Sequence, residues 1–198
     1  IDFADPGKPV IKGLTVSLKQ YGYVLLVVDT GGSHADLTPE YASVPMEMKK
    51  VAGFFRKEVL RDVAEADIYR EMGALRREFG DRAVLRALHF YEENRRVDLQ
   101  VEALENGDFA GFLELVNQSG ESSIKWLQNC FPASSPADQG VMIGLKLTKD
   151  FLKGEGACRI QGGGFAGTIL VLMPEERVGD YVEMMDGVFH EGCVKVLD

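Results

Sequence analysis

Several features that would indicate other classes of protein are scarce or missing in this sequence. The 198 residues include only three cysteines, an odd number at wide spacing and without a Cys-x-x-Cys pair. This pattern gives no disulfide framework and no zinc site, so we expect reduced thiols. No apolar run approaches the roughly 18 residues of a membrane-spanning helix, and no basic-plus-apolar leader is present. We therefore expect a cytoplasmic protein with no membrane partner.

Positive charge is also in deficit. The chain has 22 Lys and Arg against 31 Asp and Glu, which gives a formal net charge of -9. Nucleic acids and anionic membrane surfaces attract basic proteins, so neither is expected as a partner. The hydrophobic residues make up 45% of the chain, and this length and composition are sufficient for one domain with a sizeable core.

The most informative stretch is glycine-rich. Gly162, Gly163 and Gly164 are followed by Phe165, Ala166 and Gly167, directly before the apolar residues 168–173. Glycine reaches positive φ without strain and lets other groups approach the backbone closely. The run lacks the Lys of a Walker loop, and it precedes a strand where a dinucleotide fingerprint would follow one. Two interpretations remain from the local sequence, a plain β-hairpin turn and a loop that shapes a binding pocket.

Three ordered segments carry a family resemblance. The glycine run is similar to a signature that usually reads Gly-Gly-Gly-Phe-Gly-Gly. Residues 33–41 follow a strand and resemble a segment with a His, then a Leu, then Ser/Thr-x-x-Tyr. Residues 86–119 resemble Arg-Ala-x-His-x-x-x-Glu, a Gly-Asp turn and a helix that ends in Ser-His. Together these segments resemble the galactokinase branch of the kinases named for galactose, homoserine, mevalonate and phosphomevalonate.

The chain also departs from that pattern at four places. Val44-Pro45 stands where galactokinases usually have two arginines, and Gly120 follows Ser119 in place of His. Gln161 replaces a usual Thr, and Ala166 replaces a Gly. These departures bear on the identity of the sugar more than on the fold.

The resemblance implies that residues 1–198 form the C-terminal domain of such a kinase. The sugar signature, the Gly-Leu-Ser-Ser-Ser-Ala phosphate loop and the catalytic Asp of the family's N-terminal domain are absent from this chain. The implied activity of the full-length protein is transfer of the γ-phosphate of ATP to the C1 hydroxyl of galactose. Mg-ATP would be bound mainly by the N-terminal domain, which would be the partner of this chain together with the sugar and ATP. We assign no catalytic residue or metal ligand here, and we expect the isolated fragment to be inactive.

The resemblance also implies the site. Tyr41 stands where galactokinases have a sugar-contacting Tyr, and residues 162–167 would lie at the interdomain cleft beside the phosphate loop. The alternatives are a non-catalytic sugar sensor or regulator, a kinase for another sugar or small metabolite, and a free-standing small-molecule-binding module. His34 and Asp36 form either an acid–base pair or, more in keeping with the family, turn and capping groups. His89, Glu92 and Arg95 share a helix face, where we favour an internal network over a metal site.

The expected fold is α+β, with a ferredoxin-like split β-α-β core and additional helices. Strands are predicted at residues 23–29, 157–161, 168–173 and 193–197, with residues 14–18 as a further candidate. Helices are predicted at residues 38–55 with Thr38 as N-cap, 67–79, 81–105, 109–116 capped by Asp108, 139–152 and 175–190. Pro45 is expected to kink the first helix or to shift its start.

Overall fold

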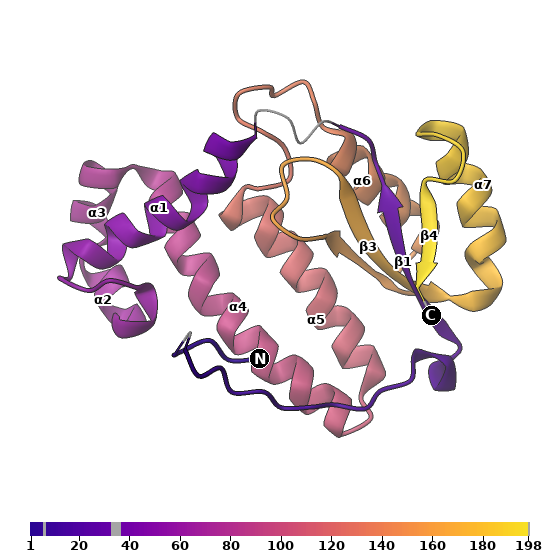
Figure 1. Cartoon of the computed structure of the whole chain (residues 1–198), viewed down its shortest axis with the longest axis horizontal. Helices are drawn as coiled ribbons and strands as arrows, with labels where there is room; N and C mark the ends of the chain where they lie inside the picture. The colour runs from indigo at the N-terminus through magenta and orange to yellow at the C-terminus, as the bar shows by residue number, and fades with distance from the viewer. Residues whose placement is uncertain (6, 33–36, 198) are drawn as a thin grey trace.

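The computed structural model describes residues 1–5, 7–32 and 37–197, and their strands form one four-stranded antiparallel sheet in the order β2-β3-β1-β4. The strands are β1 (Tyr23–Asp29), β2 (Ala157–Ile160), β3 (Thr168–Pro174) and β4 (Val194–Leu197). β2 and β3 form a hairpin, whereas helices connect β1 to β2 and β3 to β4 (Figure 1). This order and connectivity are those of a split β-α-β, ferredoxin-like sheet, so the predicted fold class is confirmed.

The helices fall into two groups, those packed on the sheet and those that extend away from it (Figure 1). Their bounds are α1 (Thr38–Phe54), α2 (Glu65–Arg70), α3 (Met72–Phe79), α4 (Asp81–Glu105), α5 (Phe109–Ser122), α6 (Gly140–Leu152) and α7 (Val178–Val188). A π-helical turn, η3 (Ser123–Leu127), continues α5. In the part of the chain that the structure describes, no helix is long and apolar enough to cross a membrane.

One face of the sheet packs against α6 and α7. Successive side chains of a strand point to opposite faces, and in β1 both Leu26 and Val28 are fully buried on this side. They form the main core with residues such as Leu145 of α6 and Met185 of α7. The alternation of buried and less buried side chains in β1 and β3 therefore fixes the register of the two strands. In this register Asp29 pairs with Thr168, so the end of β1 lies beside the start of β3.

The opposite face of the sheet packs against α5. Leu113 of α5 and Leu172 of β3 are buried in a second core on this side. Asn117 also lies along the outer edge of β2: its Nδ2 donates to the Gly156 carbonyl at 3.1 Å, and its Oδ1 accepts from the Cys158 amide at 3.1 Å. The helix thus satisfies backbone groups that an edge strand would otherwise expose.

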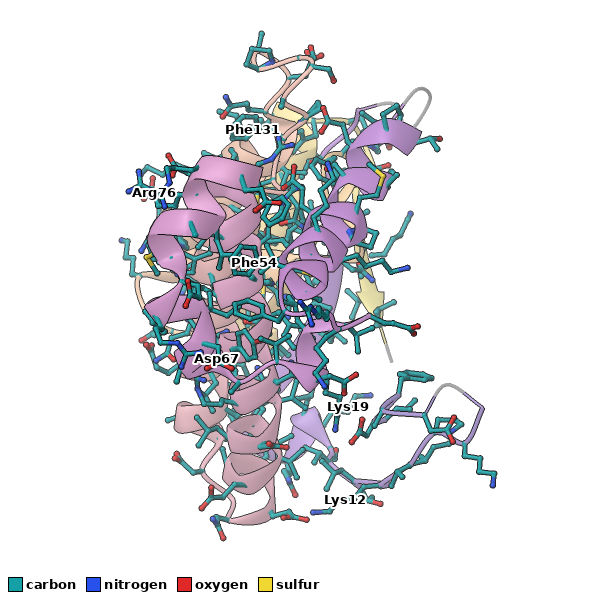
Figure 2. The ribbon with its side chains drawn as sticks, turned by 90° about the vertical axis from the view of Figure 1, so that its left-hand side faces the viewer. Lys12, Lys19, Phe54, Asp67, Arg76 and Phe131 are labelled. Carbon is teal, nitrogen blue, oxygen red and sulfur yellow. The ribbon has the colours of Figure 1, made fainter. Side chains whose placement is uncertain are left out.

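A helical lobe stands apart from the sheet. It comprises α1, α2, α3 and the first part of α4, and its own core includes Val51, Ile68, Leu75 and Ala87. Figure 2 looks onto this lobe, with Phe54 among its helices. Because α1 starts near the end of β1 and then enters the lobe, residues at the start of α1 lie where the lobe meets the sheet (Figure 1).

Some predicted elements are confirmed and others are wrong. β1 and α4 have the predicted bounds, and the Asp108 carboxylate caps α5 by accepting from the Gly111 amide at 2.9 Å. Residues 14–18 contain no strand, and a 3₁₀ turn, Leu18–Tyr21, begins at the last of them. The helix predicted at residues 67–79 is two helices divided at Glu71, because short helices are set by tertiary packing rather than by propensity.

The start of α1 also differs by one residue from the prediction. Leu37 occupies the N-cap position, and Thr38 is the first helical residue, with Pro39 next to it in the first turn. The helix continues through Pro45, so that proline does not move its start. A proline lacks an amide hydrogen, and Pro45 therefore leaves one backbone carbonyl in α1 without its helical donor.

Candidate functional site

The glycine-rich run is the connection between β2 and β3. The hairpin interpretation of its local sequence is therefore confirmed, because the two flanking strands are antiparallel neighbours. The backbone is far from an ordinary two-residue turn, however, since φ is positive at Gly162 (65°), Gly164 (85°), Phe165 (63°) and Gly167 (95°). Three of these four positions carry glycine, which adopts such angles without strain. The loop extends from the sheet toward the first turn of α1 (Figure 1).

Asn129 packs directly against the middle of this loop. A Cβ atom added to Gly164 would lie 2.2 Å from the Asn129 backbone oxygen and 2.5 Å from its Nδ2, so only glycine fits there. The Asn129 Nδ2 donates to the Gly163 carbonyl at 3.1 Å, and the Phe165 amide donates to the Asn129 carbonyl. The loop is thus held by both the side chain and the backbone of one buried residue.

Tyr41 reaches the same loop from the first turn of α1. Its hydroxyl donates to the Gly164 carbonyl at 3.0 Å, and its ring meets the Phe165 ring edge-on at a centroid distance of 5.5 Å. A Cβ atom at Gly163 would lie 2.7 Å from Tyr41 Cε1. The structure therefore brings together Tyr41 and the glycine loop, which the sequence analysis named separately as site candidates.

The far end of the loop is tied to the end of β1. The Thr30 hydroxyl and the Thr30 amide both donate to the Gly167 carbonyl, at 2.7 Å and 2.8 Å. The Gly167 amide donates to the Gly31 carbonyl at 3.3 Å. Ala166 does not have a positive φ, so its side chain causes no backbone strain where the related signature has glycine.

A cavity of about 520 Å³ opens beside this end of the loop. The loop contributes Phe165 and Ala166 to its wall, and the end of β1 contributes Thr30 to Gly32. The remaining wall comes from Leu37 and from the segment before and at the start of α6, including Ser134, Ser135, Asp138, Gln139 and Gly140. This size is in the range of small-molecule pockets, and the mixture of hydroxyl, carboxylate and backbone groups suits a polar ligand.

Among the described residues of this wall, Asp138 carries a carboxylate. It accepts a hydrogen bond from the Ser135 hydroxyl within the same loop. His34 and Asp36, considered above as an acid–base pair or as capping groups, lie outside the described residues. Among the described residues, no group of three or more His, Cys, Asp or Glu side chains is arranged to hold a metal ion.

A buried polar cluster joins α4 to α5. His89 Nδ1 lies 2.9 Å from the Ser122 hydroxyl, which also donates to Glu92 at 3.3 Å. Burial, together with the positive charges of Arg96 and Arg159, lowers the pKa of His89 to about 4. The predicted internal network is confirmed for His89 and Glu92.

The third member of that predicted network has a different partner. Arg95 pairs with Glu65 of α2 at 2.5 Å, and Arg96 is the cation that pairs with Glu92 and Glu93. Arg96 is four residues after Glu92 and three after Glu93, which are the spacings of neighbours on a helix surface.

Arg86 was not singled out from the sequence as a site residue, yet its side chain is fully buried. Its Nε donates to the Leu127 carbonyl at 3.0 Å, and its Nη1 donates to the Ser43 hydroxyl at 2.9 Å and to Glu47 at 3.0 Å. Burial lowers the pKa of the guanidinium, and the negative charge of Glu47 opposes that effect. Arg86 therefore links α1 to the segment that leads into Asn129.

Two of the departures from the galactokinase pattern, Gly120 and Gln161, have local physical explanations. A Cβ atom at Gly120 would lie 2.9 Å from the Cys158 carbonyl oxygen, so α5 needs glycine there to approach β2. Gln161 accepts from the Thr168 hydroxyl at 3.2 Å across the base of the hairpin.

The three cysteines are buried and unpaired with one another. Burial raises the pKa of the Cys130 thiol to about 12 and that of Cys158 to about 11. Thiols with raised pKa values are poor nucleophiles at neutral pH, so these two are structural.

Comparisons with known proteins give a consistent picture. No protein-family profile matches the chain. The galactokinase of Thermotoga maritima is 32% identical to it, in an alignment that covers 89% of this chain and 49% of that protein. The galactokinase of Actinobacillus pleuropneumoniae serotype 3 is 31% identical, with 80% of this chain and 39% of that protein covered. The chain thus spans about half or less of the length of these curated relatives.

A solved structure matches the fold. The crystal structure of Lactococcus lactis galactokinase complexed with galactose has a TM-score of 0.64 to this chain, at 19% sequence identity. The match covers 89% of this chain and 44% of that chain. The architecture described above is therefore one that occurs in about half of a larger protein.

Proposed function

Because the chain is a relative of the galactokinases over most of its length, we propose that it forms the C-terminal half of a galactokinase-like sugar kinase. The full-length protein would transfer the γ-phosphoryl group of ATP to the C1 hydroxyl of galactose. This half would supply one wall of the cleft in which the sugar and the nucleotide meet, and the N-terminal half would supply the catalytic carboxylate.

The observation that carries the proposal is the contact between Tyr41 and the glycine loop. These two elements are 123 residues apart, and they were named as site candidates on separate motifs, yet the Tyr41 hydroxyl donates to the Gly164 carbonyl at 3.0 Å. A phenol and a side-chain-free backbone at one place fit a site for a polar ligand, since the phenol carries a polar hydroxyl on a packed ring and glycine places no side chain over the polar groups of the backbone.

Phosphoryl transfer fits this kind of wall. Such reactions depend mainly on positioning the nucleophile and on neutralising charge, because the protein has little covalent chemistry to perform. We assign to Tyr41 a sugar contact and to residues 162–167 the shaping of the pocket. Neither role needs a side chain of this half to accept a proton from the sugar.

Magnesium ATP would supply the transferred phosphoryl group. The described residues contain no cluster of acidic side chains with the arrangement of a metal site. We assign the binding of magnesium ATP mainly to the N-terminal half. Because the catalytic Asp, the sugar signature and the phosphate loop would come from that half, we expect the isolated chain to be inactive. Its buried core and its single sheet nevertheless give the cleft wall a rigid support.

The experiment that tests the proposal is sugar-dependent ADP release by a full-length protein that contains this chain, across a panel of hexoses. We expect turnover that favours galactose. Turnover that favours another sugar would support the proposal of a sugar kinase and contradict the proposal that galactose is its substrate. Sugar binding by calorimetry without turnover would contradict the kinase proposal in favour of a sugar sensor.

A further inference from the structure

We propose that Asn129 is the residue that positions the glycine loop, and through the loop the hydroxyl of Tyr41. This inference rests on the proposed function, because it assigns Asn129 a part in sugar binding. Asn129 would act through Gly164 and Tyr41 without touching the substrate.

Asn129 makes two hydrogen bonds to the glycine loop. Its Nδ2 donates to the Gly163 carbonyl at 3.1 Å, and its backbone carbonyl accepts from the Phe165 amide. The two bonds bracket Gly164, so the peptide groups on both sides of that glycine are fixed. Asn129 is 3% exposed, and its bonds are therefore shielded from competition with water.

Gly164 lies between Asn129 and Tyr41. The Gly164 carbonyl accepts from the Tyr41 hydroxyl at 3.0 Å. On the other side, a Cβ atom at Gly164 would lie 2.2 Å from the Asn129 carbonyl oxygen. A shift of the loop away from Asn129 would therefore move the acceptor that orients the Tyr41 hydroxyl.

The segment that leads into Asn129 is itself held by hydrogen bonds. Asn129 follows η3 and Gln128, which has the left-handed angles φ 57° and ψ 51° and whose amide donates to the Ser123 carbonyl at 2.8 Å. The buried Arg86 bonds the Leu127 carbonyl and also two residues of α1, Ser43 and Glu47.

Together these hydrogen bonds connect α1, Arg86 of α4, the segment before Asn129 and the glycine loop. Arg86 hydrogen-bonds both α1, which carries Tyr41, and the segment that leads into Asn129. Tyr41 and Asn129 each hydrogen-bond the glycine loop. The loop is therefore hydrogen-bonded from two sides, and the buried guanidinium of Arg86 fixes the position of these two sides relative to each other. Tyr41 bonds the loop through its side chain, whereas Asn129 bonds it through both its side chain and its backbone carbonyl.

The test is Asn129→Asp in the full-length protein, with Asn117→Asp as the matched control. Both amides donate from Nδ2 to a glycine carbonyl at 3.1 Å, but Asn117 does so at Gly156, at the other end of β2. An ionised carboxylate keeps the shape of the amide and loses its donor, and because burial raises the pKa of a carboxyl at this position, the KM values are compared at alkaline pH, where the carboxyl is ionised. We expect the KM for sugar to rise about fivefold to tenfold in Asn129→Asp, the fold-change of one lost hydrogen bond, with the KM for ATP unchanged.

The pH profile separates positioning from a general loss of stability. Once the carboxyl introduced by Asn129→Asp is protonated, it can donate to the Gly163 carbonyl again, so the sugar KM of this variant should fall toward the wild-type value as pH is lowered. Neither the wild type nor Asn117→Asp should show that recovery. An unchanged sugar KM in Asn129→Asp, or an equal rise in both variants, would overturn the inference.

Hydrogen–deuterium exchange of residues 162–167 tests the same inference without any substrate. Exchange should be faster in Asn129→Asp than in Asn117→Asp and the wild type. If the wild type turns over no sugar, the proposed function fails while this measurement still decides whether Asn129 holds the loop. Should Asn129→Asp fail to fold, the neutral and smaller Asn129→Ser serves for both measurements.

Discussion

The Tyr41 hydroxyl donates a hydrogen bond to the backbone carbonyl of Gly164 at 3.0 Å. The two residues come from the start of α1 and from the β2–β3 hairpin, and their contact joins the helical lobe to the sheet. Because the Phe165 ring packs edge-on against Tyr41, the phenol is fixed both at its hydroxyl and at its ring. Small changes on either side of this contact should therefore have measurable effects.

Substituting Gly164 with Ala should be strongly destabilising. The new methyl group would meet the Asn129 carbonyl at 2.2 Å, on a backbone whose φ of 85° disfavours any side chain. We expect a loss of about 2–4 kcal/mol in the free energy of unfolding, from overpacking together with backbone strain. Urea denaturation followed by circular dichroism measures this loss.

The control for that substitution is Gly179→Ala in α7. Gly179 is exposed, its φ is not positive and a Cβ atom there meets nothing within 4 Å. Alanine at this position should be neutral or stabilise the helix by up to about 1 kcal/mol. Equal losses in the two variants would contradict the close approach of Asn129 to the loop.

Arg86→Met should cost far more stability than Arg82→Ala, although both arginines pair with Glu47. The Arg86 side chain is 0% exposed, whereas that of Arg82 is 39% exposed. Removing one partner of a buried pair costs about 3–5 kcal/mol, and an exposed pair contributes about 1 kcal/mol or less. Thermal and urea unfolding of the two variants give the comparison; similar losses would show that Arg86 does not hold α1 to the segment before Asn129.

His89 should make the protein less stable in acid. Its pKa in the folded state, about 4, lies below the ordinary value of 6.5, because burial disfavours the imidazolium. Between these two pH values the unfolded chain binds a proton at His89 and the folded chain does not. The contribution of neutral His89 to the free energy of unfolding is therefore complete above about pH 6.5 and is lost as pH falls toward 4. The difference corresponds to up to about 3 kcal/mol.

Urea unfolding at several pH values between 7 and 4 tests the role of His89. The wild type should lose stability over this range more steeply than His89→Gln, which has no titrating imidazole at that position. Both proteins share the same carboxylates, so the difference between their slopes isolates His89. Parallel pH profiles would contradict the assignment.

Much of the fold could be predicted because its signals are local. The unbroken apolar run of Tyr23–Asp29 and the caps around Asp81–Glu105 set those elements within a few residues. The break at Glu71 depends on how two short helices pack against α4, which no local pattern records. The same holds for the partner of Arg95, because the Glu65 carboxylate comes from another helix.

The site was predictable only where a motif exists. The glycine loop and Tyr41 belong to recognisable segments, whereas Asn129 lies in the run Leu-Gln-Asn-Cys-Phe with no signature of its own. Its importance arises from contacts across 34 residues of sequence with Gly163. Arg86 belonged to the family resemblance, but its complete burial follows from the packing of α1, α4 and η3 together.

The most direct test of the central claim is galactose-dependent ADP release by the full-length protein, measured for the wild type and for Tyr41→Phe. The variant keeps the ring contact with Phe165 and loses only the hydroxyl. We predict turnover of galactose by the wild type and a sugar KM about fivefold to tenfold higher in the variant, the effect of one lost hydrogen bond. No turnover of any sugar by the wild type, or the same sugar KM in both proteins, would contradict the account.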